Sequence, residues 1–305
     1  MEIIYHKKTK YPLCLYHMAK KNSKRWKALL ATLLFVAMIS TVFYYHKQIT
    51  RYYFKTYRLI KRWRHRPTTG ALHTVPFPEA YSIHGIDISH YQDDINWDNL
   101  RTLSAEGDTI AFSFVFIKAT EGLWKEDRAF SGNWEDAHDH HIYCGAYHYF
   151  LADKDPKKQA ENFISSVNLQ NGDLPPVIDI EEPRGRTKEQ IVAAVQQMAT
   201  LLELRYGIKP IIYSNISFIE DYLSDDFPDY YFWVAHYYQD ELNISKEVNW
   251  LFWQHNDRAM LFGDDQTVDV NVFNGNMIEF RNILVQTGPQ FRPTANRARA
   301  AYTPR

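Results

Sequence analysis

Cysteine is scarce in this sequence, with only Cys14 and Cys144 among its 305 residues. An uncharged segment that we predict to cross a membrane separates the two, so we expect no disulfide between them and no disulfide framework. Cys144 lies in an apolar, strand-like run over residues 142–150. We interpret it as a small buried thiol, because a reactive cysteine needs an accessible and electropositive setting.

Acidic residues are almost missing from the first part of the chain. Residues 1–80 contain 16 Lys and Arg but only two acids, Glu2 and Glu79, which gives a net charge of +14. The remaining residues contain 19 Lys and Arg and 34 acids, which gives −15. This asymmetry indicates two environments, anionic lipid headgroups for the basic part and solvent for the acidic part. Nucleic-acid binding is the alternative for the basic part, and we disfavour it because a hydrophobic segment interrupts the positive charges.

Residues 28–45 contain no charged side chain. As a helix, this segment would be ~27 Å long at ~1.5 Å per residue, enough for most of the hydrocarbon core of a bilayer. Trp26 stands at one end and Tyr44 and Tyr45 at the other, as in the aromatic belts of membrane proteins. A cleavable signal peptide and a buried core helix are the alternatives. The long basic leader over residues 1–27, the lack of a small-x-small cleavage site and the all-round hydrophobicity favour an uncleaved transmembrane helix.

The rest of the chain divides by composition. Residues 46–81 form a basic stalk and linker, and residues 286–305 are rich in Pro, Arg and Ala and predicted to be disordered. Between them, residues 82–285 alternate apolar runs with amphipathic helical patterns, which is typical of parallel β/α structure. We predict strands over residues 84–89, 111–120, 143–150, 176–181, 209–214, 231–235, 250–254 and 267–270, and helices over residues 128–140, 156–167, 188–206 and 216–223. The sequence therefore predicts an α/β domain, a modified and irregular (β/α) barrel of about eight strands.

Acidic residues lie at or just after the ends of several predicted strands. They are Asp87, Glu121, Asp179, Glu181 and Asp269. The active site of a barrel forms at the carboxyl ends of its strands, and a buried strand end is an unfavourable place for a carboxylate without a partner or a function. We therefore expect these acids to gather in one site.

Asp179 and Glu181 are the strongest pair, because residues i and i+2 of a strand face the same side with α-carbons ~6.6 Å apart. Two like charges in one pocket raise at least one pKa, which leaves a protonated acid beside an ionised partner. This combination is what the hydrolysis of a glycosidic bond requires. A salt-bridged rim is the alternative that the spacing alone leaves open.

Eight short motifs follow one another along the same domain. They are HGIDISHYQ (84–92), FIKATEG (116–122), GAYHYF (145–150), DIE (179–181), IYS (212–214), WVA (233–235), FWQ (252–254) and VD (268–269). In this order they resemble the lysozymes of glycoside hydrolase family 25 over roughly residues 82–283. The resemblance implies a modified β/α barrel with N-acetylmuramidase activity, which cleaves the β-1,4 bond between N-acetylmuramic acid and N-acetylglucosamine in peptidoglycan.

The resemblance also implies roles for particular residues. Glu181 matches the general acid of the family, and Asp179 matches a neighbouring carboxylate that steers the substrate's acetamido group or activates water. Asp87 and Asp269 match two further acids of the cleft. We expect the substrate to contact Tyr147, Tyr213, Trp253, Gln254 and Glu121. Core packing is the open alternative for Trp253, and a structural role is the open alternative for Tyr213 and Gln254.

Two histidine features are interpreted as structural. His148, in the GAYHYF motif, is predicted to be a hydrogen-bonded core histidine rather than a base. A cluster of acids and histidines lies between residues 136 and 141, namely Asp136, His138, Asp139, His140 and His141. Its spacing repeats no known set of metal ligands, so we predict neither a metal nor another cofactor.

The expected protein is therefore a peptidoglycan hydrolase, anchored in a membrane through its N-terminal segment, with the catalytic domain outside the cytoplasm. A chitinase-like or endo-glucosaminidase hydrolase is one alternative. A catalytically inactive, membrane-tethered glycan-binding module is another, and it is disfavoured because binding alone needs no paired acids.

Overall fold

The computed structural model describes residues 26–42, 45, 76–92, 95–104, 107–261 and 267–286. The chain forms two compact units, Met1–His65 and Arg66–Arg305. Residues 46–75 of the predicted stalk and linker, residues 1–25 of the predicted leader and residues 287–305 of the predicted tail lie outside the described residues.

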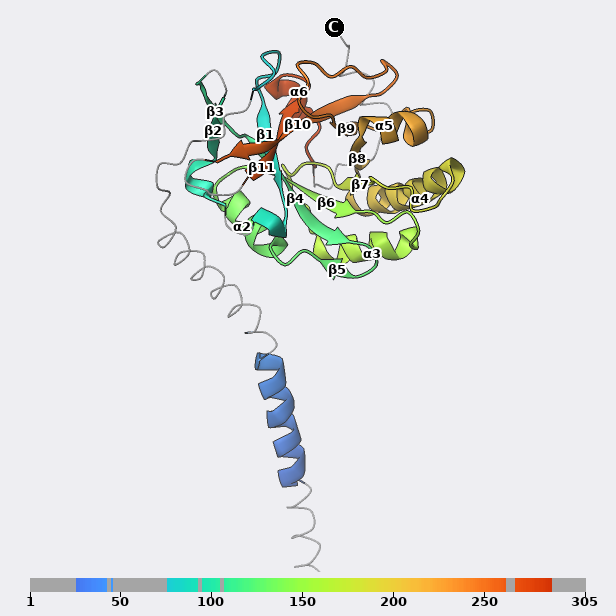
Figure 1. Ribbon diagram of the computed structural model, residues 1–305. Helices are drawn as coiled ribbons and strands as arrows, with labels where there is room; N and C mark the ends of the chain where they lie inside the picture. Colours follow the sequence, from blue (N-terminus) through green and yellow to red (C-terminus); the bar gives the residue numbers. More distant parts are fainter. Residues whose placement is uncertain are drawn as a thin grey trace, which may run out of the picture. The chain divides into compact units, whose positions relative to one another are not determined.

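The described part of the first unit is a helix over residues 26–42 (Figure 1). Its apolar side chains are exposed along the whole helix, including Leu33, Leu34 and Phe35. Within the described residues, no helix reaches both the length and the apolar character needed to cross a bilayer. Residues 43 and 44, which belong to the predicted transmembrane segment, are not described.

The second unit is a closed barrel of eight strands among the described residues, in the order β1-β11-β10-β9-β8-β7-β6-β4, with β4 paired again to β1 (Figure 1). The strands are β1 (His84–Ile88), β4 (Phe114–Glu121), β6 (Tyr143–Tyr149), β7 (Val177–Asp179), β8 (Ile211–Asn215), β9 (Phe232–Ala235), β10 (Trp250–Met260) and β11 (Thr267–Phe273). Seven strands run parallel, and β11 is antiparallel to both of its neighbours. The predicted irregular barrel is thus confirmed, and all eight predicted strands are present.

Helices and short elements connect the strands. The helices are α2 (Phe130–Asp139), α3 (Pro156–Ser166), α4 (Lys188–Tyr206), α5 (Ile216–Phe218), which continues into the π-helical turn η3 (Ile219–Leu223), and α6 (Met277–Asn282). The short elements are η1 (His90–Gln92), η2 (Trp97–Asn99), the hairpin of β2 (Arg101–Leu103) and β3 (Thr109–Ala111), and β5 (Lys125–Glu126), which pairs with the end of β4. The helix predicted over residues 188–206 is confirmed at both ends. Thr187 and Gln190 form a capping box at its start, and Gly207 ends it with a φ of 72°.

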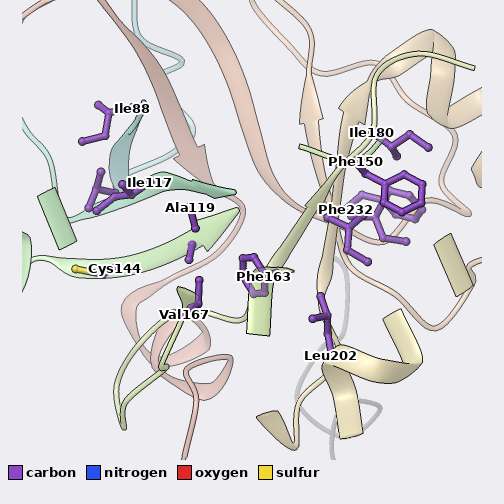
Figure 2. Close-up of a cluster of buried hydrophobic side chains, with 14 of the residues drawn as sticks. Ile88, Ile117, Ala119, Cys144, Phe150, Phe163, Val167, Ile180, Leu202 and Phe232 are labelled. Carbon is purple, nitrogen blue, oxygen red and sulfur yellow. The ribbon is translucent and has the colours of Figure 1, made fainter. Parts of the chain in front are cut away.

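The outward faces of the strands pack beneath the helices and form the larger hydrophobic core. Figure 2 shows part of this layer, where Ile117 and Ala119 of β4 lie with Phe163 of α3 and Leu202 of α4. Cys144 belongs to the same layer, is buried and is free. The prediction of a small buried thiol at Cys144 is therefore confirmed.

The inward faces fill one end of the barrel with aromatic rings. Phe116 stacks on Trp233 with ring centroids 4.4 Å apart, and Phe114 lies 5.1 Å from Phe252. Two inward glycines leave room for these rings, because a Cβ on Gly85 or Gly145 would lie 2.4 Å from the ring of Phe114 or Phe116, respectively. The interior is thus apolar at this level, and polar side chains gather only towards the carboxyl ends of the strands.

Candidate active site

A pocket of about 170 Å³ opens at the carboxyl ends of the parallel strands. Nine residues line it: Asp87, Tyr147, Asp179, Glu181, Tyr213, Trp233, Tyr237, Gln254 and Asp269. Seven of them are residues that the sequence predicts for the site, including all four acids proposed to take part in the reaction. Strands that are far apart in the sequence bring them together, because the barrel places the carboxyl ends of its parallel strands and the start of the antiparallel β11 on one face.

Asp179 and Glu181 occupy one side of the pocket. Asp179 is the last residue of β7 and only 4% exposed, whereas Glu181 follows in the loop and is exposed at the mouth of the pocket. Burial, and then the charge of Glu181, raise the pKa of Asp179 well above its ordinary value. Protein atoms around the Glu181 carboxyl also desolvate it and raise its pKa.

The two carboxyl groups lie close enough to hydrogen-bond to each other. Two carboxyl groups can do so only when one of them carries a proton, and this contact acts to raise the pKa of Asp179 and to lower that of Glu181. No hydrogen-bond donor among the described residues reaches Oδ1 of Asp179, although this atom is buried. The pair therefore combines two carboxyl groups of raised pKa with a buried oxygen that has no donor among the described residues.

Asp87 and Asp269 form a second carboxyl pair, opposite each other on β1 and β11. Nε2 of Gln254 donates to Asp87 at 2.7 Å and to Asp269 at 3.2 Å, and Nδ2 of Asn271 donates to Asp87 at 2.8 Å. Burial raises the pKa of Asp87 to about 6. Burial, and then the charge of Asp87, raise the pKa of Asp269 to about 9. At neutral pH, Asp269 thus keeps its proton, while two amide donors stabilise the charge on Asp87.

Gln254 is held in one orientation by two tyrosines. The hydroxyl groups of Tyr213 and Tyr237 both donate to Oε1 of Gln254, each at 2.7 Å. This arrangement turns Nε2 of Gln254 towards the two carboxyl groups. Gln254 and Tyr213 therefore line the pocket and also support its acids.

Sequence reasoning missed Trp233, Tyr237 and Asn271 as members of the site. Nε1 of Trp233 donates to Oδ1 of Asn271 at 2.7 Å, and this contact orients the amide that supports Asp87. The period of two along a strand was the available signal. Residues 233, 235 and 237 share one face, and so do residues 269 and 271.

Two residues predicted to bind the substrate do not line the pocket. Trp253 is fully buried and donates from Nε1 to the backbone oxygen of His236 at 2.7 Å, an arrangement that favours the core-packing alternative. Glu121 lies in ion pairs with Lys118 at 2.8 Å and Lys125 at 3.0 Å. Burial acts to raise the pKa of Glu121, but hydrogen bonds from the two lysines outweigh it and lower the pKa.

Three histidines of the domain, His138, His140 and His148, have structural partners. His148 is buried, shares a hydrogen bond of 2.7 Å with the hydroxyl of Thr120, and has its pKa lowered to about 4 by burial, as predicted for a core histidine. His138 and His140 pair with Asp173 at 2.7 Å and with Asp98 at 3.0 Å. Over the part of the chain that the structure covers, no group of three or more potential metal ligands occurs.

Known proteins resemble this chain in sequence and in fold. Residues 86–264 match the sequence model of the glycosyl hydrolases family 25. YegX, an uncharacterized protein of Escherichia coli K12, is 36% identical over 259 residues, which cover 84% of this chain and 93% of YegX. The autolytic lysozyme of Clostridium acetobutylicum is 26% identical over 204 residues, which cover 67% of this chain and 60% of that protein. The structure of a family 25 glycosyl hydrolase from Bacillus anthracis is 34% identical and has a TM-score of 0.62, covering 70% of this chain and 98% of the other.

Proposed function

Because the chain belongs to glycosyl hydrolase family 25, we propose that its pocket hydrolyses the β-1,4 bond between N-acetylmuramic acid and N-acetylglucosamine in peptidoglycan. The chain is thus a glycoside hydrolase, and the lysozyme activity is the specific proposal. The observation that carries it is the carboxyl pair of Asp179 and Glu181 in the pocket lining, where burial raises the pKa of both groups. The autolytic lysozyme among the relatives supports the choice of peptidoglycan as substrate.

Glu181 is the general acid in this proposal. Glu181 is exposed at the pocket mouth, where a glycosidic oxygen can reach it, and desolvation of its carboxyl group raises its pKa, so that it stays protonated to a higher pH. Protonation of the leaving oxygen is the step that a glycosidase requires of such a group.

Asp179 assists the substrate's acetamido group. Its Oδ1 is buried and has no donor among the described residues, so an acetamide N–H can provide the missing hydrogen bond. With its nitrogen held there, the acetamido oxygen attacks the anomeric carbon while the bond to the leaving oxygen breaks and Glu181 protonates that oxygen. Asp179 stabilises the positive charge that develops on the ring so formed, and water then attacks the anomeric carbon and opens this ring. This route retains the anomeric configuration, whereas a water activated by Asp179 would invert it. Proton NMR of the first product distinguishes the two, and an inverted anomer would exclude the acetamido route.

Substitution of Glu181 tests the proposal directly. Glu181→Gln keeps the shape of the side chain and removes the proton, so the rate at which purified full-length chain clears a peptidoglycan suspension should fall about 10²- to 10⁴-fold. Glu182→Gln is the matched control, because Glu182 is the adjacent exposed residue, lies outside the pocket lining and pairs with Arg184 at 3.2 Å. A Glu181→Gln rate within about threefold of the wild type would place the general acid elsewhere.

The N-terminal segment serves as a membrane anchor in this proposal, with the barrel outside the cytoplasm. The support is the uncharged stretch of residues 28–45, its basic flanks and the exposed apolar side chains of the helix over residues 26–42. Protease added to intact spheroplasts should digest the barrel and spare the leader. Protection of the barrel would reverse the orientation.

A further inference from the structure

Exposed aromatic side chains gather on the pocket face of the barrel. Among the described residues from 76 to 286, the exposed large apolar side chains are Tyr91 (77%), Trp124 (81%), Tyr238 (49%), Leu204 (78%) and Ile278 (74%). The three aromatic residues all follow the carboxyl end of a barrel strand, namely β1, β4 and β9. The two aliphatic residues lie in helices α4 and α6. Aromatic exposure is thus concentrated at the end of the barrel that holds the pocket.

Tyr91 is held firmly in this exposed position. Its neighbour His90 binds the buried carboxylate of Asp127 twice, through the backbone N–H at 3.1 Å and through Nδ1 at 2.7 Å. The Tyr91 ring lies on the His90 ring with centroids 4.2 Å apart and planes 32° apart. One face of Tyr91 is therefore supported, and its exposure leaves the other available.

Trp124 lies at the turn of the hairpin formed by β4 and β5. Gly122 shapes this turn with a φ of 57°, and the side chain of Asn162 donates to the backbone oxygens of Gly122 at 3.0 Å and Lys125 at 3.4 Å. The indole of Trp124 makes no hydrogen bond or ring contact with any other residue in the described ranges. A well-anchored turn thus presents an indole that the rest of the barrel leaves uncovered.

Asp127 joins these two segments to each other and to the pocket. It directly follows β5, its backbone N–H donates to the oxygen of Ala119 in β4 at 2.8 Å, and its side chain binds His90. Burial, and then carboxylates that include Asp127, raise the pKa of Tyr147, which lines the pocket. Tyr91 and Trp124 therefore belong to one sector of the rim, next to the pocket. We call this pair the aromatic platform.

Tyr238 lies on the opposite sector of the rim. In the barrel, β9 is separated from β4 by three strands and from β1 by two. The Tyr238 ring lies 6.1 Å from the ring of Tyr237, which lines the pocket. The guanidinium of Arg258 lies over the Tyr238 ring at 4.8 Å. Exposed rings thus stand on both sides of the pocket, along a line that crosses the end of the barrel.

We propose that the glycan strand crosses this end of the barrel, and that the aromatic platform of Tyr91 and Trp124 binds sugar rings beyond the pocket; this rests on the proposed function. The pocket of about 170 Å³ is smaller than the roughly 300–1,000 Å³ typical of small-molecule sites, so a polymer must contact surface outside it. Flat rings provide such contacts, because they cover the C–H face of a pyranose and gain by burying apolar area.

The surroundings of the platform favour a glycan over a lipid surface or a protein. Protein and membrane sites are contiguous apolar patches, whereas Tyr91 and Trp124 are separate rings. Around Trp124, the hairpin carries charges of both signs, with Glu121, Lys125 and Glu126. Single rings set among polar groups suit a ligand that alternates C–H faces with hydroxyl and amide groups.

The experiment compares glycan strands of different length, freed of their peptides, as substrates of the full-length chain. For the double variant Tyr91→Ala/Trp124→Ala, the KM for long strands should rise about tenfold, and the preference for long strands over tetrasaccharides should fall by a similar factor. Trp124→Phe should recover part of the effect, because it restores a flat ring. Leu204→Ala removes an equally exposed side chain from α4 and should match the wild type.

Three outcomes would overturn the platform. One is a KM for long strands in the double variant equal to that of the wild type. Another is an equal increase in KM for tetrasaccharides and long strands, which would indicate damage to the pocket. The third is a lost affinity for vesicles of anionic phospholipid with an unchanged KM, which would make the rings a membrane contact. All three presuppose an active wild type, so a failure of the proposed lysozyme activity is seen separately, as absence of cleavage before any variant is compared.

Discussion

Replacement of Asp269 by asparagine should stabilise the barrel, and increasingly so as the pH rises. The pKa of Asp269 is raised from 3.8 to about 9 in the folded chain, first by burial and then by the charge of Asp87. Between these two values the folded state holds a proton that the unfolded state has released. Wild-type stability therefore falls as the pH increases through this window, whereas an asparagine does not titrate.

The magnitude follows from the width of that window. At pH 7 the wild type is roughly three pH units above the unfolded pKa, and at ~1.4 kcal/mol per unit this sets an upper bound of about 4 kcal/mol. Asp87 and Asp269 share their titration, so part of this free energy belongs to Asp87, and we expect a gain of about 2 kcal/mol. Asparagine can keep the local hydrogen bonds, because its oxygen can accept from Gln254 and its amide can donate to Asp87.

Urea unfolding of the full-length chain, followed by tryptophan fluorescence, measures the effect at about pH 5 and about pH 8. The difference between variant and wild type in the free energy of unfolding should be larger at the higher pH. Asp240→Asn, which removes an exposed carboxylate outside the pocket, controls for the change in net charge. An Asp269→Asn variant that is destabilised equally at both pH values would refute the assignment of a retained proton to Asp269.

Two further substitutions test the interior and the outer layer of the barrel. Gly145→Ala should lower the free energy of unfolding by about 1–3 kcal/mol, because the added Cβ would lie 2.4 Å from the Phe116 ring. Phe116→Leu in the same chain should recover part of the loss. An unchanged urea midpoint for Gly145→Ala would contradict this reasoning. Asp173→Asn should lower the free energy of unfolding by about 1.5–3 kcal/mol, since Asp173 binds His138 and raises the pKa of that histidine from 6.5 to about 11. A raised histidine pKa stabilises fully below the unfolded value, so this loss should be larger at about pH 6 than at about pH 9; an increase towards pH 9 would contradict the pairing.

The strand ends could be predicted from the sequence because the chemistry and the topology agree there. Acids after apolar runs predict a shared face in a parallel barrel, and Asp87 and Asp179 do meet in the pocket. Asp269 reaches the pocket for another reason, because β11 runs antiparallel and brings its first residues to the same face. Which neighbour in a strand faces inward was harder. Trp253 and Gln254 were both predicted to contact the sugar, but adjacent residues of a strand face opposite sides. In the structure, Gln254 lines the pocket, whereas Trp253 is buried outside the pocket lining.

Glu121 shows a second limit of sequence reasoning. In a regular strand, every second residue of β4 would face the same side, as residues 114, 116 and 118 do. The pairing of β4 with β6, however, shifts between Lys118 and Thr120. Beyond this bulge, Thr120 bonds to the buried His148 in the outer layer, and Glu121 pairs with two lysines. A bulge adds a residue to one strand without a regular sequence signal, so the side chain at position 121 could not be placed by counting.

The two carboxyl pairs of the pocket differ in the number of their donors, and this difference assigns their roles. Asp87 accepts hydrogen bonds from Gln254 and Asn271, which stabilise its charge in place. The described residues supply no such donor to Oδ1 of Asp179, and the partner of Asp179 is the carboxyl group of Glu181. Burial and the charge of Glu181 raise the pKa of Asp179, and the charge of Asp87 adds to this effect. In the proposed reaction the pair with fewer donors is the reactive one, and the well-bonded pair adds negative charge next to it.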